Sequence, residues 1–320
     1  MVENRGISLF RANALYLLAA VGLVLLDLAA TLLSSIEGLN TGAASVLLNV
    51  GYYVLFLGAP VLLYAARRQD GLDTLRMLPL PLSRALLIAL LAASALMLVS
   101  LVSMWFLALV EATGGTAYDT ALPMPKSRAG IIGMVLQVAV LPGIFEELLF
   151  RGALLRAWEK RGGTYAVVVT TLLFAALHST VLGLPSQLIS GAIMALLVIR
   201  LNSVYASMIF HTVYNGLNYG LALYANSAVD AAEAAALESA TTVELLGGAG
   251  GLLALVPSML LFALITYFLY RMCVRWSQPV LLRDSRPEPM DWKSLVVLAS
   301  ALITCAAYYA LDVAAIWFVP

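Results

Sequence analysis

The chain has 320 residues, of which 62% are hydrophobic and 11% are charged, and its mean hydropathy is +0.95. Soluble domains are about half apolar and a quarter charged, so this composition excludes an ordinary soluble domain and indicates a polytopic membrane protein. The formal net charge is zero. We therefore expect contacts with a lipid bilayer and no binding of nucleic acid.

Nine apolar segments are predicted to be membrane-spanning helices, because crossing a hydrocarbon core of about 30 Å takes about 20 helical residues. In chain order these segments cover 12–34, 44–66, 85–110, 132–158, 164–184, 187–199, 203–223, 252–272 and 294–318. The sixth is short, which predicts a tilted, re-entrant or buried helix. The expected fold is an all-α bundle of eight to nine transmembrane helices.

The basic residues support this segmentation, since they gather in alternate connections between the predicted helices. Cytoplasmic loops of membrane proteins are enriched in Lys and Arg. The pattern predicts a cytoplasmic N-terminus and an external C-terminus. We also expect residence in a plasma membrane of bacterial type. The connections are short, so we expect N-terminal spans over 1–127, a functional core over 128–224 and C-terminal spans over 225–320. The acidic connection 225–244 predicts a surface helix.

Ionisable residues interrupt the fourth segment, where Glu146, Glu147 and Arg151 lie in an otherwise apolar run. An ionised side chain in hydrocarbon costs roughly 3 kcal/mol on insertion scales, so these residues are expected to serve a function. Glu147 and Arg151 have the spacing of an intrahelical ion pair. Glu146 is turned by about 100° from Glu147, which leaves it free to point elsewhere.

The two histidines of the chain, His178 and His211, both lie in predicted spans. Asn215 follows His211 by one helical turn, so these two side chains share a helix face. Glu146, His178 and His211 each fall within about two turns of the middle of their segments. Three helices can thus bring the acid, both imidazoles and the Asn215 amide together within the membrane.

Such a set of side chains supports hydrolysis. Glu146, surrounded by apolar groups, would be a stronger base than in water and could take a proton from a water that His178 also holds. His211 and Asn215 could then donate to the oxyanion. Alternatively, Glu146, His178 and His211 could ligate a catalytic zinc. The zinc signature HExxH is absent, so the sequence leaves both chemistries open.

Three motifs in this region resemble those of a known family. Glu146-Glu147-x-x-x-Arg151, Phe174-x-x-x-His178 and His211-x-x-x-Asn215 match, in order, the motifs of the CPBP intramembrane proteases, which include the CAAX prenyl endopeptidases. The resemblance implies that Glu146 and His178 activate water and that His211 and Asn215 form the oxyanion site. It also implies supporting roles for Glu147, Arg151 and Phe174, and a membrane-associated peptide or protein as the substrate.

Other interpretations remain open at the level of sequence. The polar residues could form structural ion pairs and interhelical hydrogen bonds, as is common in membrane bundles. A proton-coupled transporter could use the same Glu and His residues, and it would need an aqueous path across both leaflets. A non-catalytic immunity or scaffold protein would need none of their chemistry. Asp27 and Asp312 are also predicted to be intramembrane, without an identifiable partner, and are interpreted as interior helix contacts.

Overall fold

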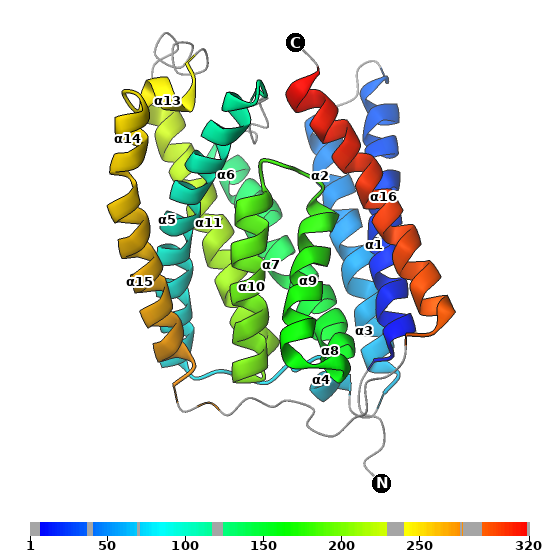
Figure 1. Ribbon diagram of the computed structural model, residues 1–320. Helices are drawn as coiled ribbons and strands as arrows, with labels where there is room; N and C mark the ends of the chain where they lie inside the picture. The colour runs from blue at the N-terminus through cyan, green and yellow to red at the C-terminus, as the bar shows by residue number, and fades with distance from the viewer. Residues whose placement is uncertain are drawn as a thin grey trace.

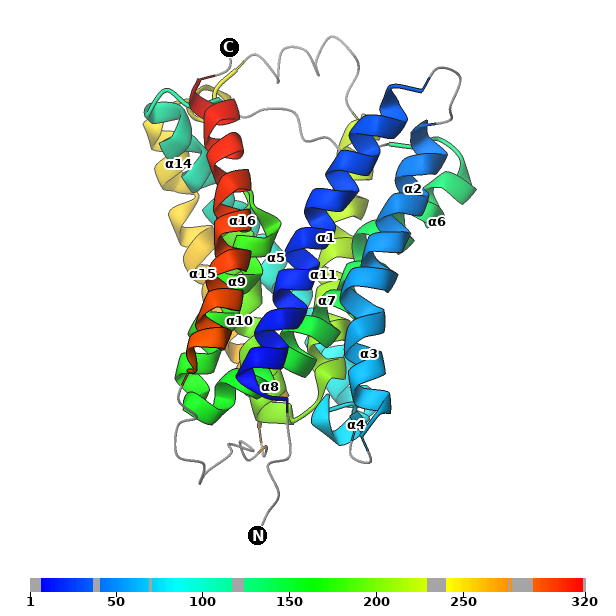
Figure 2. The same cartoon turned by 90° about the vertical axis from the view of Figure 1, so that its right-hand side faces the viewer.

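A computed structural model of the protein describes residues 7–36, 41–68, 71–116, 124–228, 240–275, 277 and 290–318, and every regular element among them is helical. Each of the nine predicted segments overlaps a helix or a run of helices. The all-α class is therefore confirmed. Figures 1 and 2 show the long helices side by side, with α1 (Leu9–Ser34) beginning at the lower end and α16 (Trp292–Trp317) ending at the upper end.

The first half of the chain forms four spans with several helical types. The second span joins α2 (Thr41–Gly51), the π-helical η1 (Tyr52–Gly58) and α3 (Ala59–Ala66), and the short α4 (Gly71–Thr74) precedes the long α5 (Leu82–Ala112). The fourth span joins six consecutive elements, namely α6 (Arg128–Val135), η2 (Leu136–Val140), α7 (Leu141–Glu147), η3 (Leu148–Leu154), α8 (Leu155–Trp158) and η4 (Glu159–Arg161).

The second half contains the three helices that complete the centre of the bundle and those that flank it. The central helices are α9 (Gly163–His178), α10 (Leu184–Leu201) and α11 (Val204–Ala228). After them come α13 (Thr242–Leu245), α14 (Ala249–Ala254), α15 (Val256–Cys273) and α16. Helix α11 packs against α5, α7, α10 and η2, whereas α15 packs against α5 at one side and α16 against α1 at the other (Figure 1). The predicted surface helix over 225–244 falls largely outside the described residues.

Among the described residues, seven helices are long and apolar enough to cross a membrane, so the predicted count of nine spans is not confirmed. Helix α9 has 16 residues, or about 24 Å of rise, which is less than the hydrocarbon thickness. Helix α11 has 25 residues but carries a histidine and three asparagines, and these lower its hydropathy.

The boundary between the fifth and sixth segments differs from the prediction. The fifth was expected to continue to residue 184, but α9 ends at His178 because Ser179 adopts the left-handed conformation, with φ of 52°. The sixth segment begins earlier than expected, at Leu184, and its 18 residues meet the criterion for a span. The polar turn between them places His178 at a helix end inside the bundle, which periodicity alone does not indicate.

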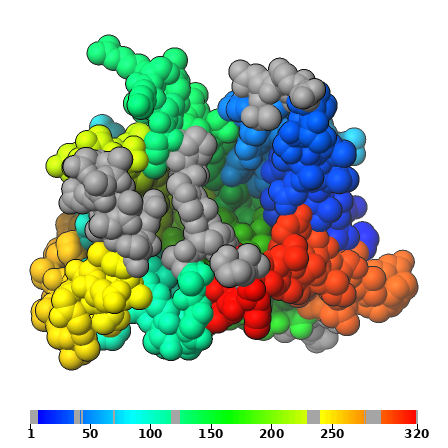
Figure 3. All heavy atoms as spheres, turned by 90° about the horizontal axis from the view of Figure 1, so that it is seen from above, coloured from blue at the N-terminus to red at the C-terminus, as the bar shows by residue number. Residues whose placement is uncertain are grey.

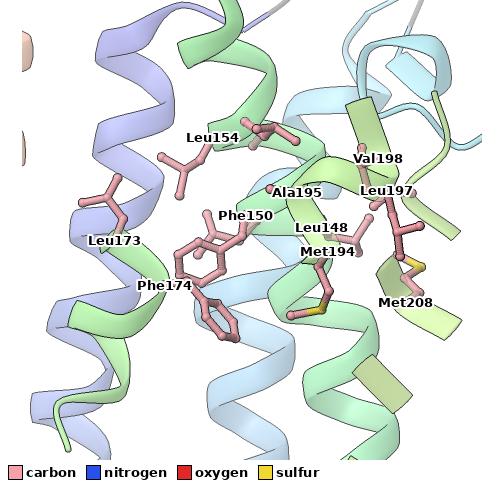
Figure 4. Packing of buried hydrophobic residues seen from close by; sticks show 14 of the residues in the cluster. Leu148, Phe150, Leu154, Leu173, Phe174, Met194, Ala195, Leu197, Val198 and Met208 are labelled. Atoms are coloured by element: carbon pink, nitrogen blue, oxygen red, sulfur yellow. The ribbon is translucent and has the colours of Figure 1, made fainter. Parts of the chain in front are cut away.

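The hydrophobic core surrounds the lower half of the fourth span. Leu149, Phe150 and Leu154 are fully buried there, and Figure 4 shows Phe150 beside Phe174 of α9 and close to Met194 of α10. The rings of Phe150 and Phe174 meet edge to face, with centroids 5.1 Å apart. Aromatic pairs in this arrangement add stability beyond their buried area. The core therefore fixes the fourth span against α9 and α10.

A buried ion pair fastens the lower end of the fourth span to the connection before α5. Arg76 donates two hydrogen bonds to Glu159, at 2.8 and 2.7 Å, and both side chains are buried. Arg76 is left-handed, with φ of 55°, and its carbonyl accepts a hydrogen bond from Val204 N at the start of α11. One residue thus joins three parts of the bundle.

We expect Glu159→Ala to lower the free energy of unfolding by about 3–5 kcal/mol, because it removes the carboxylate that accepts two hydrogen bonds from the buried Arg76 guanidinium. The measurement is the apparent unfolding temperature in detergent micelles. The double variant Arg76→Met/Glu159→Leu should recover most of the loss, and Asp73→Ala, at an exposed side chain nearby, is the control. An unchanged unfolding temperature in Glu159→Ala would contradict this role of the pair.

Candidate active site

Two π-helical segments flank α7, the element that carries Glu146 and Glu147. Segment η2 precedes α7 and η3 follows it, so the fourth span changes its helical period twice around the two carboxylates. Such π-helical insertions are rare and occur frequently at functional sites. Their effect is to rotate the residues of η3, including Arg151, relative to a continuous α-helix. The sequence reveals the charged residues but not this change of period.

Pro142 explains how the neighbouring helix α11 attaches to this region. Proline has no N–H, so the carbonyl of Val138, four residues earlier, cannot receive its α-helical hydrogen bond. The Nδ2 of Asn215 donates to this carbonyl at 3.0 Å. Asn215, the last residue of the third sequence motif, therefore satisfies the Val138 carbonyl that Pro142 leaves without a helical donor. One of the two N–H groups of the amide is used, and the other is available.

Glu147 is the centre of a fully buried network. Its Oε1 lies 2.8 Å from Arg151 Nη1, which confirms the predicted intrahelical pair, and also 2.8 Å from Nδ1 of His211. Arg151 in turn donates to the carbonyl of Gly191 at 3.0 Å. Its guanidinium also lies over the ring of Phe174, 4.6 Å from the centroid. Since an ionised carboxylate only accepts hydrogen bonds, the His211 Nδ1 must carry a proton.

Glu146 and His178 face each other at the wall of a cavity. Glu146 Oε2 lies 3.7 Å from His178 Nε2, which is too long for a direct hydrogen bond. This oxygen is buried and has no hydrogen-bond partner among the described residues, whereas Oε1 accepts from the Tyr53 hydroxyl at 3.4 Å. The other ring nitrogen of His178, Nδ1, lies 2.8 Å from the carbonyl of Phe174. A carbonyl only accepts, so Nδ1 carries a proton, and in the neutral imidazole Nε2 presents its lone pair to the cavity.

The end of α9 is held by side chains from helices distant in sequence. The hydroxyls of Tyr16 and Tyr309 donate to the carbonyls of Leu173 and Ala175, each at 2.9 Å. The carboxylate of Asp312 accepts from the Val181 N–H at 2.7 Å, which fixes the turn after His178. Asp312, for which the sequence offered no partner, thus positions the histidine through the backbone.

The structure brings three of the four predicted catalytic residues to one cavity. Glu146, His178 and Asn215 line a space of about 1010 Å³ that reaches up between α2, α6 and η2. His211 is buried beside them without lining this cavity, since Glu147 holds one of its nitrogens and its ring packs against Phe174. Phe174 contacts both imidazoles, with ring centroids 4.4 Å from His178 and 5.9 Å from His211.

A second, smaller cavity of about 350 Å³ shares Glu146, His178 and Tyr53 with the first. Its other lining residues come from α1, η1, α16 and the end of α9 with the turn after it, and they include Asp27, Tyr52 and Tyr308. Sequence reasoning flagged Asp27 as an intramembrane carboxylate but did not connect it with the site. Tyr53, which donates to Glu146, was missed altogether, because a tyrosine in an apolar span carries no distinctive signal.

The residues present do not form a zinc site. Among the described residues, no three or more His, Cys, Asp or Glu side chains are grouped so that they could hold a metal ion. The proposed ligand His211 has its Nδ1 engaged with Glu147, and it does not line the cavity shared by Glu146 and His178. We therefore derive no step through a metal.

The fold and the site define a polytopic membrane protein with a buried polar centre, and comparison with known families agrees. Residues 128–217 match the family model described as type II CAAX prenyl endopeptidase Rce1-like. This segment contains all seven motif residues, and the match confirms the resemblance to the CPBP intramembrane proteases. It supports a protease role at the membrane. Searches of curated proteins and of solved structures gave no match.

We expect Gly143→Ala to disturb the contact between α7 and α11, because an added Cβ would clash with the hydroxyl of Thr212 and lie 3.0 Å from its backbone N. Overpacking of this kind costs about 1–3 kcal/mol, which thermal unfolding in detergent would measure. Gly133→Ala, in the same span, is the matched control, since its Cβ meets nothing within 4 Å. Equal stability of the two variants would show that this close approach is unimportant.

Proposed function

We propose that the protein is an intramembrane endopeptidase in which Glu146 and His178 activate the attacking water. The observation that carries this proposal is the pairing of an unpartnered Glu146 Oε2 with a His178 Nε2 lone pair, 3.7 Å apart at the wall of a large cavity. Both atoms accept hydrogen bonds. A water placed between them would donate one hydrogen to each, and its own lone pairs would then point into the cavity.

The proposed reaction begins when this water attacks the carbonyl carbon of a peptide bond. Glu146 takes the proton as the new C–O bond forms, and it later returns that proton to the leaving amine. His178 holds the second hydrogen and keeps the water in place. The Phe174 carbonyl fixes the tautomer of His178, and the Tyr53 hydroxyl restrains the other oxygen of Glu146.

The oxyanion of the tetrahedral intermediate would lie against α11. Asn215 lines the same cavity and retains one N–H group after its bond to Val138, so it is the first donor. His211 can add a second donor only as the imidazolium, because its Nδ1 proton is committed to Glu147. Glu147, which accepts the Nδ1 proton of His211, is thereby assigned to positioning this imidazole.

The substrate class follows from the setting of the site. A cavity of about 1010 Å³ inside a helical bundle has room for an extended peptide or for a peptide with a lipid chain. We therefore propose a membrane-associated peptide or protein as the substrate, with prenylated CAAX-like proteins included by the family resemblance. We also propose that the core over 128–224 holds the chemistry and that the N-terminus faces the cytoplasm.

The transporter alternative receives some support from Asp27, which lines the smaller cavity together with Glu146 and His178. A transporter also needs an aqueous path beyond the site. In the described structure, the fully buried side chains of Phe150, Leu154 and Trp158 follow the carboxylates along the same span. These packed side chains favour hydrolysis at a closed-ended site over transport.

We expect Glu146→Gln and His178→Ala each to reduce cleavage by roughly 10²- to 10⁴-fold, the usual contribution of a general base or of the group that positions its water. The measurement compares the peptides of membranes carrying the wild type or each variant by mass spectrometry. Asp73→Asn, at an exposed carboxylate, is the control. Undiminished cleavage by a well-folded Glu146→Gln protein would refute the mechanism.

Asn215→Ala should lower the rate by about 10²- to 10³-fold while substrate binding changes little, because an oxyanion donor acts in the transition state. Steady-state kinetics on a cleaved peptide would separate kcat from KM. The matched control is Asn218→Ala, which removes an exposed amide from the same helix. An effect on KM alone would indicate that Asn215 binds substrate and does not stabilise the oxyanion.

A further inference from the structure

The larger cavity opens at one end of the bundle. Its lining includes Ser45 in the first turns of α2, and Met124 and Pro125 just before α6. Glu146 lies 18 residues after the start of α6, or about 27 Å along the span. Seen from above, this end of the molecule is hollowed between α1 and α2 on one side and the other helices (Figure 3).

The opposite end of the molecule carries the positive charge. Arg and Lys residues sit at the ends of α3, the fourth span, α10 and α15 and at the starts of α5 and α16. Near the cavity mouth, the described basic residues are Lys126 and Arg128, and acidic Glu111 and Glu244 lie at the same end of the bundle. Excess Lys and Arg mark the cytoplasmic side of a membrane protein. The mouth therefore belongs to the external side.

The cytoplasmic end beneath the site is filled. Going down the fourth span from Glu147, the side chains of Arg151, Leu154 and Trp158 are each at most 1% exposed. The buried pair of Arg76 and Glu159 follows at the end of the span. A peptide arriving from the cytoplasm would have to separate these packed and paired groups, and leaving a buried charge without its partner is strongly unfavourable.

We infer that the substrate reaches the site from the external side of the membrane, as an exported or membrane-inserted peptide segment. This inference rests on the proposed function and restricts its substrate class. Within the substrates proposed above, it favours exported or membrane-inserted segments over the lipidated C-terminus of a cytosolic protein, which would meet the filled end. The cavity wall fits an extended apolar peptide, since Val46, Met134 and Val138 offer apolar contacts and the amides of Asn49 and Gln137 can pair with a peptide backbone.

The test is the accessibility of introduced cysteines in the full-length protein. In a Cys273→Ala/Cys305→Ala background, Ser45→Cys at the mouth should react with a membrane-impermeant maleimide in intact cells. Leu72→Cys, 65% exposed at the basic end, should react only after permeabilisation. Gln137→Cys probes the cavity itself, because Gln137 lines it. The matched control is Leu136→Cys, since Leu136 is the adjacent residue, is exposed and does not line the cavity.

We expect the impermeant reagent to label Gln137→Cys from outside and to leave Leu136→Cys unlabelled, because Leu136 faces lipid. Labelling of Leu72→Cys in place of Ser45→Cys in intact cells would overturn the inference, and so would equal protection of positions 136 and 137. Labelling requires no catalysis. An external mouth combined with a fully active Glu146→Gln protein would therefore refute the proposed function and leave the sidedness intact.

Discussion

The structure depends on the buried contacts of Glu147. This carboxylate binds Arg151 on its own span and His211 on α11, and Arg151 reaches the backbone of Gly191 on α10. Three segments of the bundle are thus joined by charge-assisted hydrogen bonds in a medium that offers no water. Leaving any of these groups unpaired would be costly, so the network strongly favours one arrangement of the three helices. Glu146, the next residue, is thereby held at the cavity.

A second principle of the site is that irregular backbone in the membrane must still satisfy its polar groups. Pro142 frees the carbonyl of Val138, and Asn215 takes it. The Val181 N–H lies in the turn after α9, outside the helix, and the Asp312 carboxylate accepts its hydrogen bond. In both cases the compensating side chain also positions a residue of the site. The contacts that satisfy the backbone are therefore also the contacts that position the residues proposed to be catalytic.

The two adjacent glutamates have different proposed roles because their surroundings differ. Glu147 is completely enclosed, and its Oε1 is held by both Arg151 and His211, so it serves structure and holds a proton on His211. Glu146 has one weak donor, Tyr53, and an oxygen turned toward His178 and the cavity. A carboxylate that is buried but incompletely satisfied is suited to accept a proton during a reaction.

The sequence by itself determined the helical membrane class, the position of most helices and the residues of the polar centre, because charge in an apolar span is costly and conspicuous. It also gave the pairing of Glu147 with Arg151, which depends only on helical spacing. The tertiary structure alone decided that Glu147 holds His211, that Tyr53 and Asp27 lie at the cavities and that α9 stops at His178. These features arise from contacts between distant segments and from local changes of backbone conformation, which hydropathy and periodicity do not encode.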